Sequence, residues 1–138
     1  MPAELLLKVN LACSLYMAGL IWFVQIVHYP LFQQVGREAF LDYEQRHQRL
    51  TTSVVAPAML VELIASIAIL LVAPAPPLVW LASALTILVW LSTMVIQVPL
   101  HGKLAKGFHS APLKTLVASN WIRTIAWSTR SILLLWTI

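Results

Sequence analysis

The sequence predicts an all-α fold, a four-helix transmembrane bundle, and three observations lead to this prediction. The 138 residues are 60% hydrophobic and only 10% charged, whereas soluble domains carry about 25% charged residues. The chain contains four long apolar stretches, and each approaches the roughly 20 residues that a helix needs to cross a bilayer. The six tryptophans fit this class, because indole rings favour the membrane interface. We therefore expect a single integral membrane domain over residues 1–138.

The expected spans are separated by proline, glycine and charged residues. They cover approximately residues 11–29, 54–73, 78–100 and 115–138. Pro30 and Gly36 interrupt the first apolar run, and the third ends near Pro99. The polar segment 37–53 has helical spacing, so we expect an amphipathic helix or an extension of the second span. A second amphipathic segment is expected between the third and fourth spans.

Basic residues are concentrated in two of the connections. Those connections contain Arg37, Arg46 and Arg49, and Lys103, Lys106 and Lys114, and the opposite side has only Lys8. Because cytoplasmic loops carry an excess of Lys and Arg, both long loops are expected in the cytoplasm and both termini outside, in a bacterial inner membrane. The same distribution explains the net charge of +4 without nucleic acid as a partner. The expected partners are the lipid bilayer and a lipophilic small molecule, with a homo-oligomer or a larger membrane complex left open.

A faint internal repeat relates the two halves of the chain. An offset of 69 residues superposes Pro30-Leu31 on Pro99-Leu100, so that each half reads as helix, Pro-Leu, basic connection and helix. Two parallel hairpins related by an axis along the membrane normal would produce this pattern. The sequence therefore suggests an internal duplication.

Ionisable side chains in or next to a membrane span are candidates for a functional site, because burying them in a bilayer is unfavourable. Glu44 and His47 have the i, i+3 spacing that puts two side chains on one helix face, as in di-metal carboxylate bundles. With His28, Glu62 and His101 they form a set of three imidazoles and two carboxylates. Such a set suits iron, copper, manganese or zinc. The alternative is that Glu44 and His47 lie on the exposed face of a charged helix.

Glu62 is the most informative single residue, because its neighbours are apolar and a buried carboxylate requires a partner. It is either a metal ligand or proton-transfer group, or one half of an ion pair with Arg123 or Arg130. Both interpretations stay open at this point. As an active-site group, Glu62 would act together with Arg123.

The last span carries one polar stripe, because Asn120, Arg123, Trp127 and Arg130 recur at helical spacing. Such a stripe is expected to face the interior of the bundle. There Asn120 and Arg123 are candidates to bind an anionic head group on a lipid-like substrate.

The small size, the four spans, the segment HYPLF at 28–32 and the segment NWIRTIAW at 120–127 resemble those of small four-helix bacterial membrane proteins, including the anthrone oxygenase-like family. The resemblance implies oxygen-dependent chemistry on an apolar substrate. It matches no catalytic motif, so no functional residue is carried over from the family.

Three functions are compatible with these patterns. The first is a metal-dependent oxidoreductase that acts on a lipophilic substrate at the cytoplasmic end of the bundle. The second is a non-enzymatic subunit that binds haem, pigment or quinone, with His28 and His101 as axial ligands of a haem. The third is a small proton-coupled carrier that uses Glu62 and Arg123.

Overall fold

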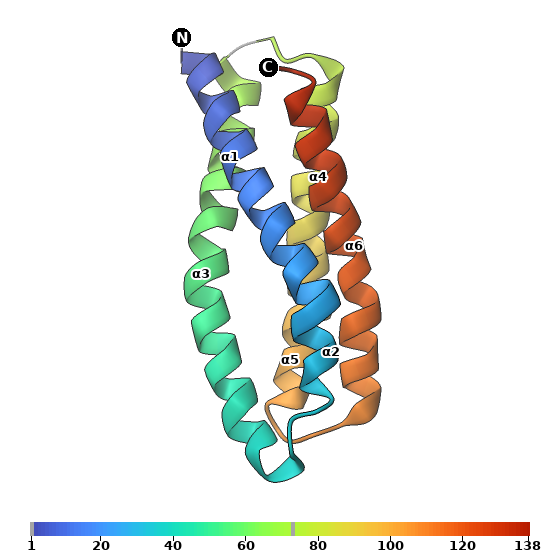
Figure 1. Cartoon of the computed structure of the whole chain (residues 1–138). Helices are drawn as coiled ribbons and strands as arrows, with labels where there is room; N and C mark the ends of the chain where they lie inside the picture. The colour runs from blue at the N-terminus through green and yellow to red at the C-terminus, as the bar shows by residue number, and fades with distance from the viewer. Residues whose placement is uncertain (1, 73) are drawn as a thin grey trace.

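The chain folds into four long helical rods (Figure 1). The computed structural model describes residues 2–72 and 74–138, and no strand occurs in these ranges. The elements are α1 (Pro2–Phe23), η1 (Val24–His28), α2 (Tyr29–Phe32), α3 (Arg37–Val72), α4 (Pro77–Ser92), η2 (Thr93–Gln97), α5 (Val98–Leu104) and α6 (Ser110–Leu135), where η denotes a π-helical turn. Helices α1, η1 and α2 form one continuous rod, and α4, η2 and α5 form another.

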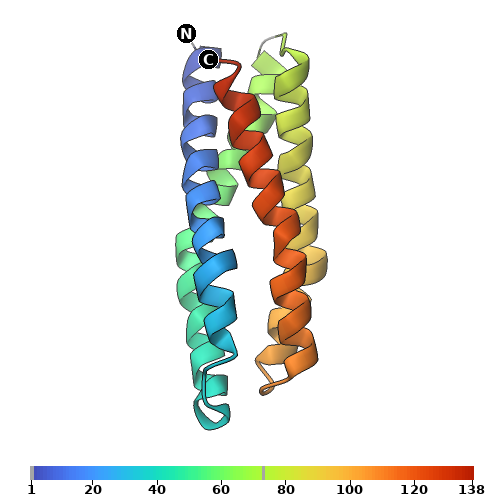
Figure 2. The same cartoon turned by 45° about the vertical axis from the view of Figure 1, so that its right-hand side comes forward.

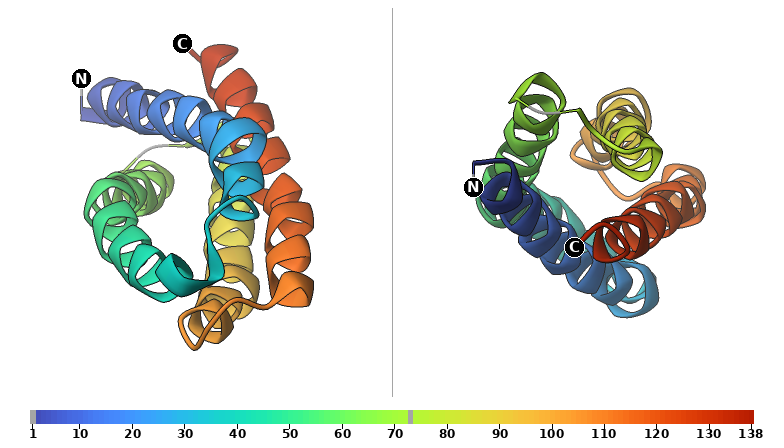
Figure 3. Two further views of the ribbon diagram at one scale, coloured as in Figure 1. Left: turned by 60° about the horizontal axis from the view of Figure 1, so that its bottom comes forward. Right: turned by 90° about the horizontal axis from the view of Figure 1, so that it is seen from above.

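The rods form an elongated bundle with both chain termini at one end (Figures 1 and 2). Helix α1 packs on α3 and α6, and α4 packs on α6. Helices α3 and α4 contact each other less than these pairs do. Seen from above, they lie at separate corners of the bundle (Figure 3, right). The connections 33–36 and 105–109 lie together at the end opposite to the termini, here called the loop end.

Three of the rods have the length and apolar composition of membrane-spanning helices, namely Ala3–Phe32, Arg37–Val72 and Pro77–Leu104. Many large apolar side chains face outward, among them Leu71 and Trp136, which are 80% and 81% exposed. The expectation of a helical membrane protein is confirmed at this level. Helix α3 has 36 residues and is therefore about 54 Å long, well beyond a hydrocarbon core of about 30 Å. The segment 37–53 is thus the extension of the second apolar helix.

The prolines at the loop end do not end their helices, contrary to the expected boundaries at Pro30 and Pro99. Each lies just after a π-helical turn, and the turns 24–28 and 93–97 are 69 residues apart. Proline has no N–H and its ring crowds the carbonyl four residues earlier. The wider turn accommodates this, because Tyr29 N–H donates to the Val24 carbonyl and Val98 N–H donates to the Thr93 carbonyl. The helices therefore continue to Phe32 and Leu104.

Two apolar clusters hold the rods together. At the loop end Phe32, Phe40 and Leu104 are completely buried. Nearer the middle, Met17 packs with Met59 and with the fully buried Trp127. Polar side chains lie between and beyond these clusters, and they form the candidate site.

Candidate functional site: a chamber with a polar end

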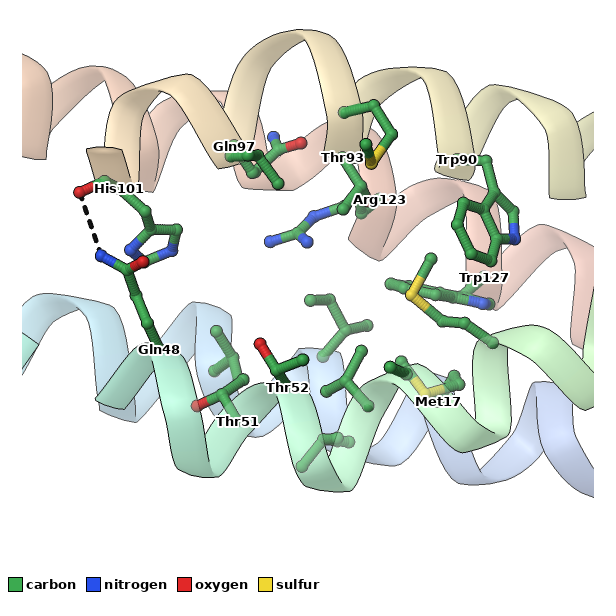
Figure 4. Close-up of a pocket in the computed structure, with 18 of the residues that line it drawn as sticks. Met17, Gln48, Thr51, Thr52, Trp90, Thr93, Gln97, His101, Arg123 and Trp127 are labelled. Atoms are coloured by element: carbon green, nitrogen blue, oxygen red, sulfur yellow. Dashed lines mark hydrogen bonds between the residues drawn. The ribbon is translucent and has the colours of Figure 1, made fainter. Parts of the chain in front are cut away.

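An elongated chamber of about 280 Å³ lies between the rods. Along α3 its lining extends from His47 to Met59, which is about 18 Å of helix. One part of the wall is apolar and includes Met17, Trp90 and Trp127, whereas the end nearer the loops is polar (Figure 4). The chamber thus has the form of a ligand site, which is mostly apolar with a few placed polar groups.

The rim of the chamber lies between α3 and the α4–α5 rod. On the α3 side the lining residue Thr52 is exposed, and on the other side Met94 and Val98 are 56% and 51% exposed. These residues lie on the lateral surface of the bundle rather than at its ends. The chamber therefore opens on the side of the bundle, between α3 and the α4–α5 rod.

Four of the five expected metal ligands come together at the polar end. His28 Nε2 lies 2.9 Å from His47 Nδ1, and the His47 and His101 ring centroids are 5.2 Å apart. The Glu44 Oε1 atom lies 2.6 Å from His101 Nδ1. Glu44 is completely buried and His47 is 9% exposed, so the alternative of an exposed charged face is wrong. The i, i+3 spacing did place both side chains on one inward face.

A directed chain of hydrogen bonds connects Glu44 to Arg123. His101 Nδ1–H donates to the Glu44 carboxylate, which leaves His101 Nε2 as an acceptor. The Tyr29 hydroxyl donates to that nitrogen over 3.1 Å and accepts from Arg123 Nη2 over 3.3 Å. Tyr29 and His101 thus each accept a hydrogen bond on one side and donate one on the other, between the donor Arg123 and the acceptor Glu44. This arrangement can pass a proton between a molecule at Tyr29 and the Glu44 carboxylate.

Arg123 is held from its own helix and from the first rod. Its Nε and Nη2 atoms donate to Asn120 Oδ1 over 3.0 and 2.5 Å. The Asn120 amide donates in turn to Gln25 Oε1 over 2.9 Å. Gln25 lies in the π-helical turn η1, and such turns recur at functional sites. Asn120 therefore orients Arg123, whose guanidinium points into the chamber (Figure 4).

Glu62 lies elsewhere, in a second polar cluster nearer the termini. It is 18 residues beyond Glu44 on the same helix, or about 27 Å away. Its Oε1 accepts from Arg130 Nη1 over 2.5 Å and its Oε2 from Trp127 Nε1 over 3.0 Å. The pairing of Glu62 with Arg123 is therefore not formed. Of the two expected ion pairs, the structure contains the one with Arg130.

The polar stripe on α6 faces inward as expected. Asn120, Trp127 and Arg130 are completely buried, and Arg123 is 7% exposed. The stripe contributes one arginine to each polar region of the bundle. Arg123 lies at the polar end of the chamber, and Arg130 lies in the cluster around Glu62.

The candidate metal ligands do not surround a common point at which an ion could bind. Within residues 2–72 and 74–138, no three His, Cys, Asp or Glu side chains are arranged so that they could hold one ion. The imidazoles bond to each other and to Glu44 instead. One feature favours a further ligand, because the buried Glu44 Oε2 atom accepts no hydrogen bond from any described residue. The residue types suit a transition metal, but their arrangement here is that of a hydrogen-bonded network.

The sequence did not identify Tyr29 and Gln48 as residues of the site. Tyr29 links Arg123 to His101, and Gln48 donates to Glu44 Oε1 over 3.1 Å. Tyr29 neighbours His28 at the expected end of the first span, where a tyrosine is ordinarily an interfacial anchor. Gln48 follows His47 in a run of polar residues, and nothing in that run distinguishes it as a donor to Glu44.

Comparisons with known proteins leave the site to be interpreted from its own geometry. No family model matches the chain, and neither the curated proteins nor the solved structures contain a match.

Proposed function

We propose that α6 also spans the membrane, which makes the chain a four-span bundle. The support is its division into faces, since Ile125, Ile132 and Leu135 are 60%, 56% and 51% exposed while its two arginines point inward. A helix with this pattern is apolar toward lipid and polar toward the bundle. The distribution of Lys and Arg favours a cytoplasmic loop end, with both termini outside. The bacterial inner membrane is the matching location.

The two halves of the bundle are proposed to descend from one duplicated hairpin. The 69-residue offset that relates Pro30 to Pro99 also relates the π-helical turns 24–28 and 93–97. Each turn also bonds to α6 through a buried glutamine, Gln25 or Gln97, although the two glutamines occupy different positions in their turns. Duplication would account for two such uncommon turns at equivalent positions.

The chamber is proposed to bind a lipophilic molecule that enters from the bilayer. The observation that carries this proposal is an apolar cavity ending on the buried guanidinium of Arg123, next to Tyr29 and His101. The apolar part of the ligand would lie toward Trp127 and its polar head would meet Arg123. The relay from Tyr29 through His101 to Glu44 would then exchange a proton with that head group.

Quenching of tryptophan fluorescence tests this binding, because Trp90 and Trp127 line the chamber. Protein in lipid nanodiscs is titrated with 12-bromododecanol and with 12-bromododecanoic acid, whose bromine atoms quench nearby indoles. We expect saturable quenching that is lost in Ala56→Phe, which fills the chamber. The matched control is Val54→Phe on the same helix, since Val54 is 47% exposed and does not line the chamber. Identical quenching in both variants, for both probes, would exclude the chamber as a binding site.

A second candidate function is the metal-dependent oxidoreductase expected from the sequence. The specific observation in its favour is the unpartnered Glu44 Oε2 among the imidazoles of His28, His47 and His101. Small rotations of these side chains would exchange their mutual hydrogen bonds for bonds to one ion. Glu62 is no longer part of this ligand set, because it is paired with Arg130.

Elemental analysis and a visible spectrum of the purified protein test this second function. About one equivalent of iron, copper, manganese or zinc in the wild type, lost in His47→Ala and retained in His109→Ala, would support it. His109 is an exposed histidine at the start of α6 and serves as the matched control. A strong visible band would instead indicate the haem- or pigment-binding subunit. A metal-free, colourless protein would exclude both and would leave proton-coupled transport to be tested in liposomes.

A further inference from the structure

The bundle contains two buried arginines, Arg123 and Arg130, and of these Arg130 forms an ion pair with a carboxylate. Arg130 is completely buried and is neutralised by Glu62, with additional hydrogen bonds to Asn10, Ser66 and Thr86. Every N–H-bearing atom of its guanidinium group therefore has a partner. A buried charge in a low-dielectric region requires this kind of compensation.

Arg123 has no such compensation. Its hydrogen-bond acceptors are the neutral oxygens of Asn120 and Tyr29. No carboxylate in the described part of the chain forms an ion pair with it. The nearby Glu44 carboxylate is bound to His101 instead, and two side chains separate it from the guanidinium.

The Nη1 atom of Arg123 is the guanidinium nitrogen that has no hydrogen bond to a described residue. Hydrogen bonds to described residues occupy only Nε and Nη2. The guanidinium projects into the chamber between His101 and the indoles of Trp90 and Trp127 (Figure 4). A cationic donor without a counter-ion, directed into a mostly apolar cavity, favours a ligand with a negative charge at that point.

We propose that the ligand of this chamber is a lipid-soluble monoanion, an amphiphile whose carboxylate binds Arg123 through Nη1. This inference rests on the proposed binding function and names the chemical class of the ligand. One negative charge on the ligand would balance the single positive charge of the Arg123 guanidinium. The carboxylate lies beside the Tyr29 hydroxyl, and the apolar part extends toward Met17, Met59 and Trp127.

The dimensions of the chamber restrict the apolar part of the ligand. A cavity of about 280 Å³ that follows about 18 Å of α3 holds one extended chain or one narrow ring system. A phospholipid with two acyl chains is too large to be enclosed in this volume. The exposed rim at Thr52, Met94 and Val98 gives access from the bilayer to a single-chain acid.

A matched pair of probes tests the proposal, because 12-bromododecanoic acid and 12-bromododecanol differ only in the charged head. At pH 8 an unperturbed carboxyl is ionised. Charge-assisted hydrogen bonds are typically strong enough to change affinity by tenfold or more. We expect half-maximal quenching by the acid at about one tenth of the alcohol concentration or below, after correction for the partition of each probe into the nanodisc.

Variants at position 123 test whether the guanidinium causes the preference for the acid over the alcohol. Arg123→Gln should bind both probes with similar affinity, and Arg123→Lys should keep part of the preference because the charge remains. Asn120 and Tyr29 are left intact in both variants, and thermal unfolding checks that they fold. If Arg123→Gln does not fold, the wild type and Arg123→Lys still decide the question. Chamber-dependent binding of both probes with equal affinity would overturn the monoanion proposal while leaving the binding function intact, whereas absence of chamber-dependent binding would overturn both.

Discussion

The ion pair between Glu62 and Arg130 gives a stability prediction that can be worked from the structure. Both side chains are completely buried, and Glu62 Oε1 lies 2.5 Å from Arg130 Nη1. Glu62→Ala removes the carboxylate and leaves the buried guanidinium of Arg130 charged without a counter-ion. Removal of one partner of a buried pair typically destabilises a protein by about 3–5 kcal/mol. The Trp127 indole also loses the acceptor of its hydrogen bond, so we expect an effect of at least about 3 kcal/mol.

A double-mutant cycle measures the pair itself. Arg130→Met alone should be comparably destabilising, since it leaves Glu62 without its cation. Glu62→Ala combined with Arg130→Met removes both charges, so the double variant should be more stable than the sum of the single effects implies, by about 2 kcal/mol or more. The assay is reversible unfolding in mixed micelles of mild detergent and dodecyl sulfate, followed by circular dichroism.

An exposed carboxylate provides the matched control for this cycle. Glu4 pairs with Lys8 on the surface of α1, where both side chains are more than half exposed. Glu4→Ala should leave the unfolding midpoint unchanged, because exposed pairs contribute little. The reasoning is refuted if Glu62→Ala and Arg130→Met each cost less than about 1 kcal/mol and their effects add, because the pair would then be no more important than a surface contact.

Two further predictions use the same unfolding assay. Ser14→Ala removes the hydrogen bond between the buried Ser14 and Ser131 hydroxyls, 2.9 Å apart, and should cost about 0.6 kcal/mol, as is usual for such bonds between membrane helices; a loss above about 2 kcal/mol would contradict this. His101→Ala leaves the buried Glu44 carboxylate with Gln48 as its only donor among the described residues and should cost about 1–3 kcal/mol. Adding Glu44→Gln should recover part of that loss, and no recovery would show that the interaction between His101 and Glu44 contributes little.

Local properties of the sequence were sufficient to predict the fold class. In lipid, the backbone N–H and C=O groups of a membrane-spanning stretch can find hydrogen-bond partners only in helices or closed barrels. The apolar stretches of this chain have the length of spanning helices. The helical period also predicted correctly that Asn120, Arg123, Trp127 and Arg130 lie inside the bundle. Periodicity carries this information because the side chains of one helix face share one environment.

The helix boundaries predicted at Pro30 and Pro99 were wrong, because a π-helical turn before each proline lets the helix continue. Proline disfavours a regular α-helix around it, and a sequence does not reveal whether the backbone ends the helix or widens a turn. Here the π-helical turns 24–28 and 93–97 absorb both prolines. The continuous rods carry His101 and the buried Leu104 beyond the expected end of the third span.

The sequence by itself determined that this chain is a helical membrane protein with charged groups inside, and that His28, Glu44, His47 and His101 belong near one end. Only the tertiary structure decided how the buried charges pair, because pairing depends on the rotation and depth of whole helices rather than on spacing within one of them. It assigned Glu62 to Arg130 and His101 to Glu44. That choice leaves the guanidinium of Arg123 directed into a chamber without a carboxylate from the described part of the chain.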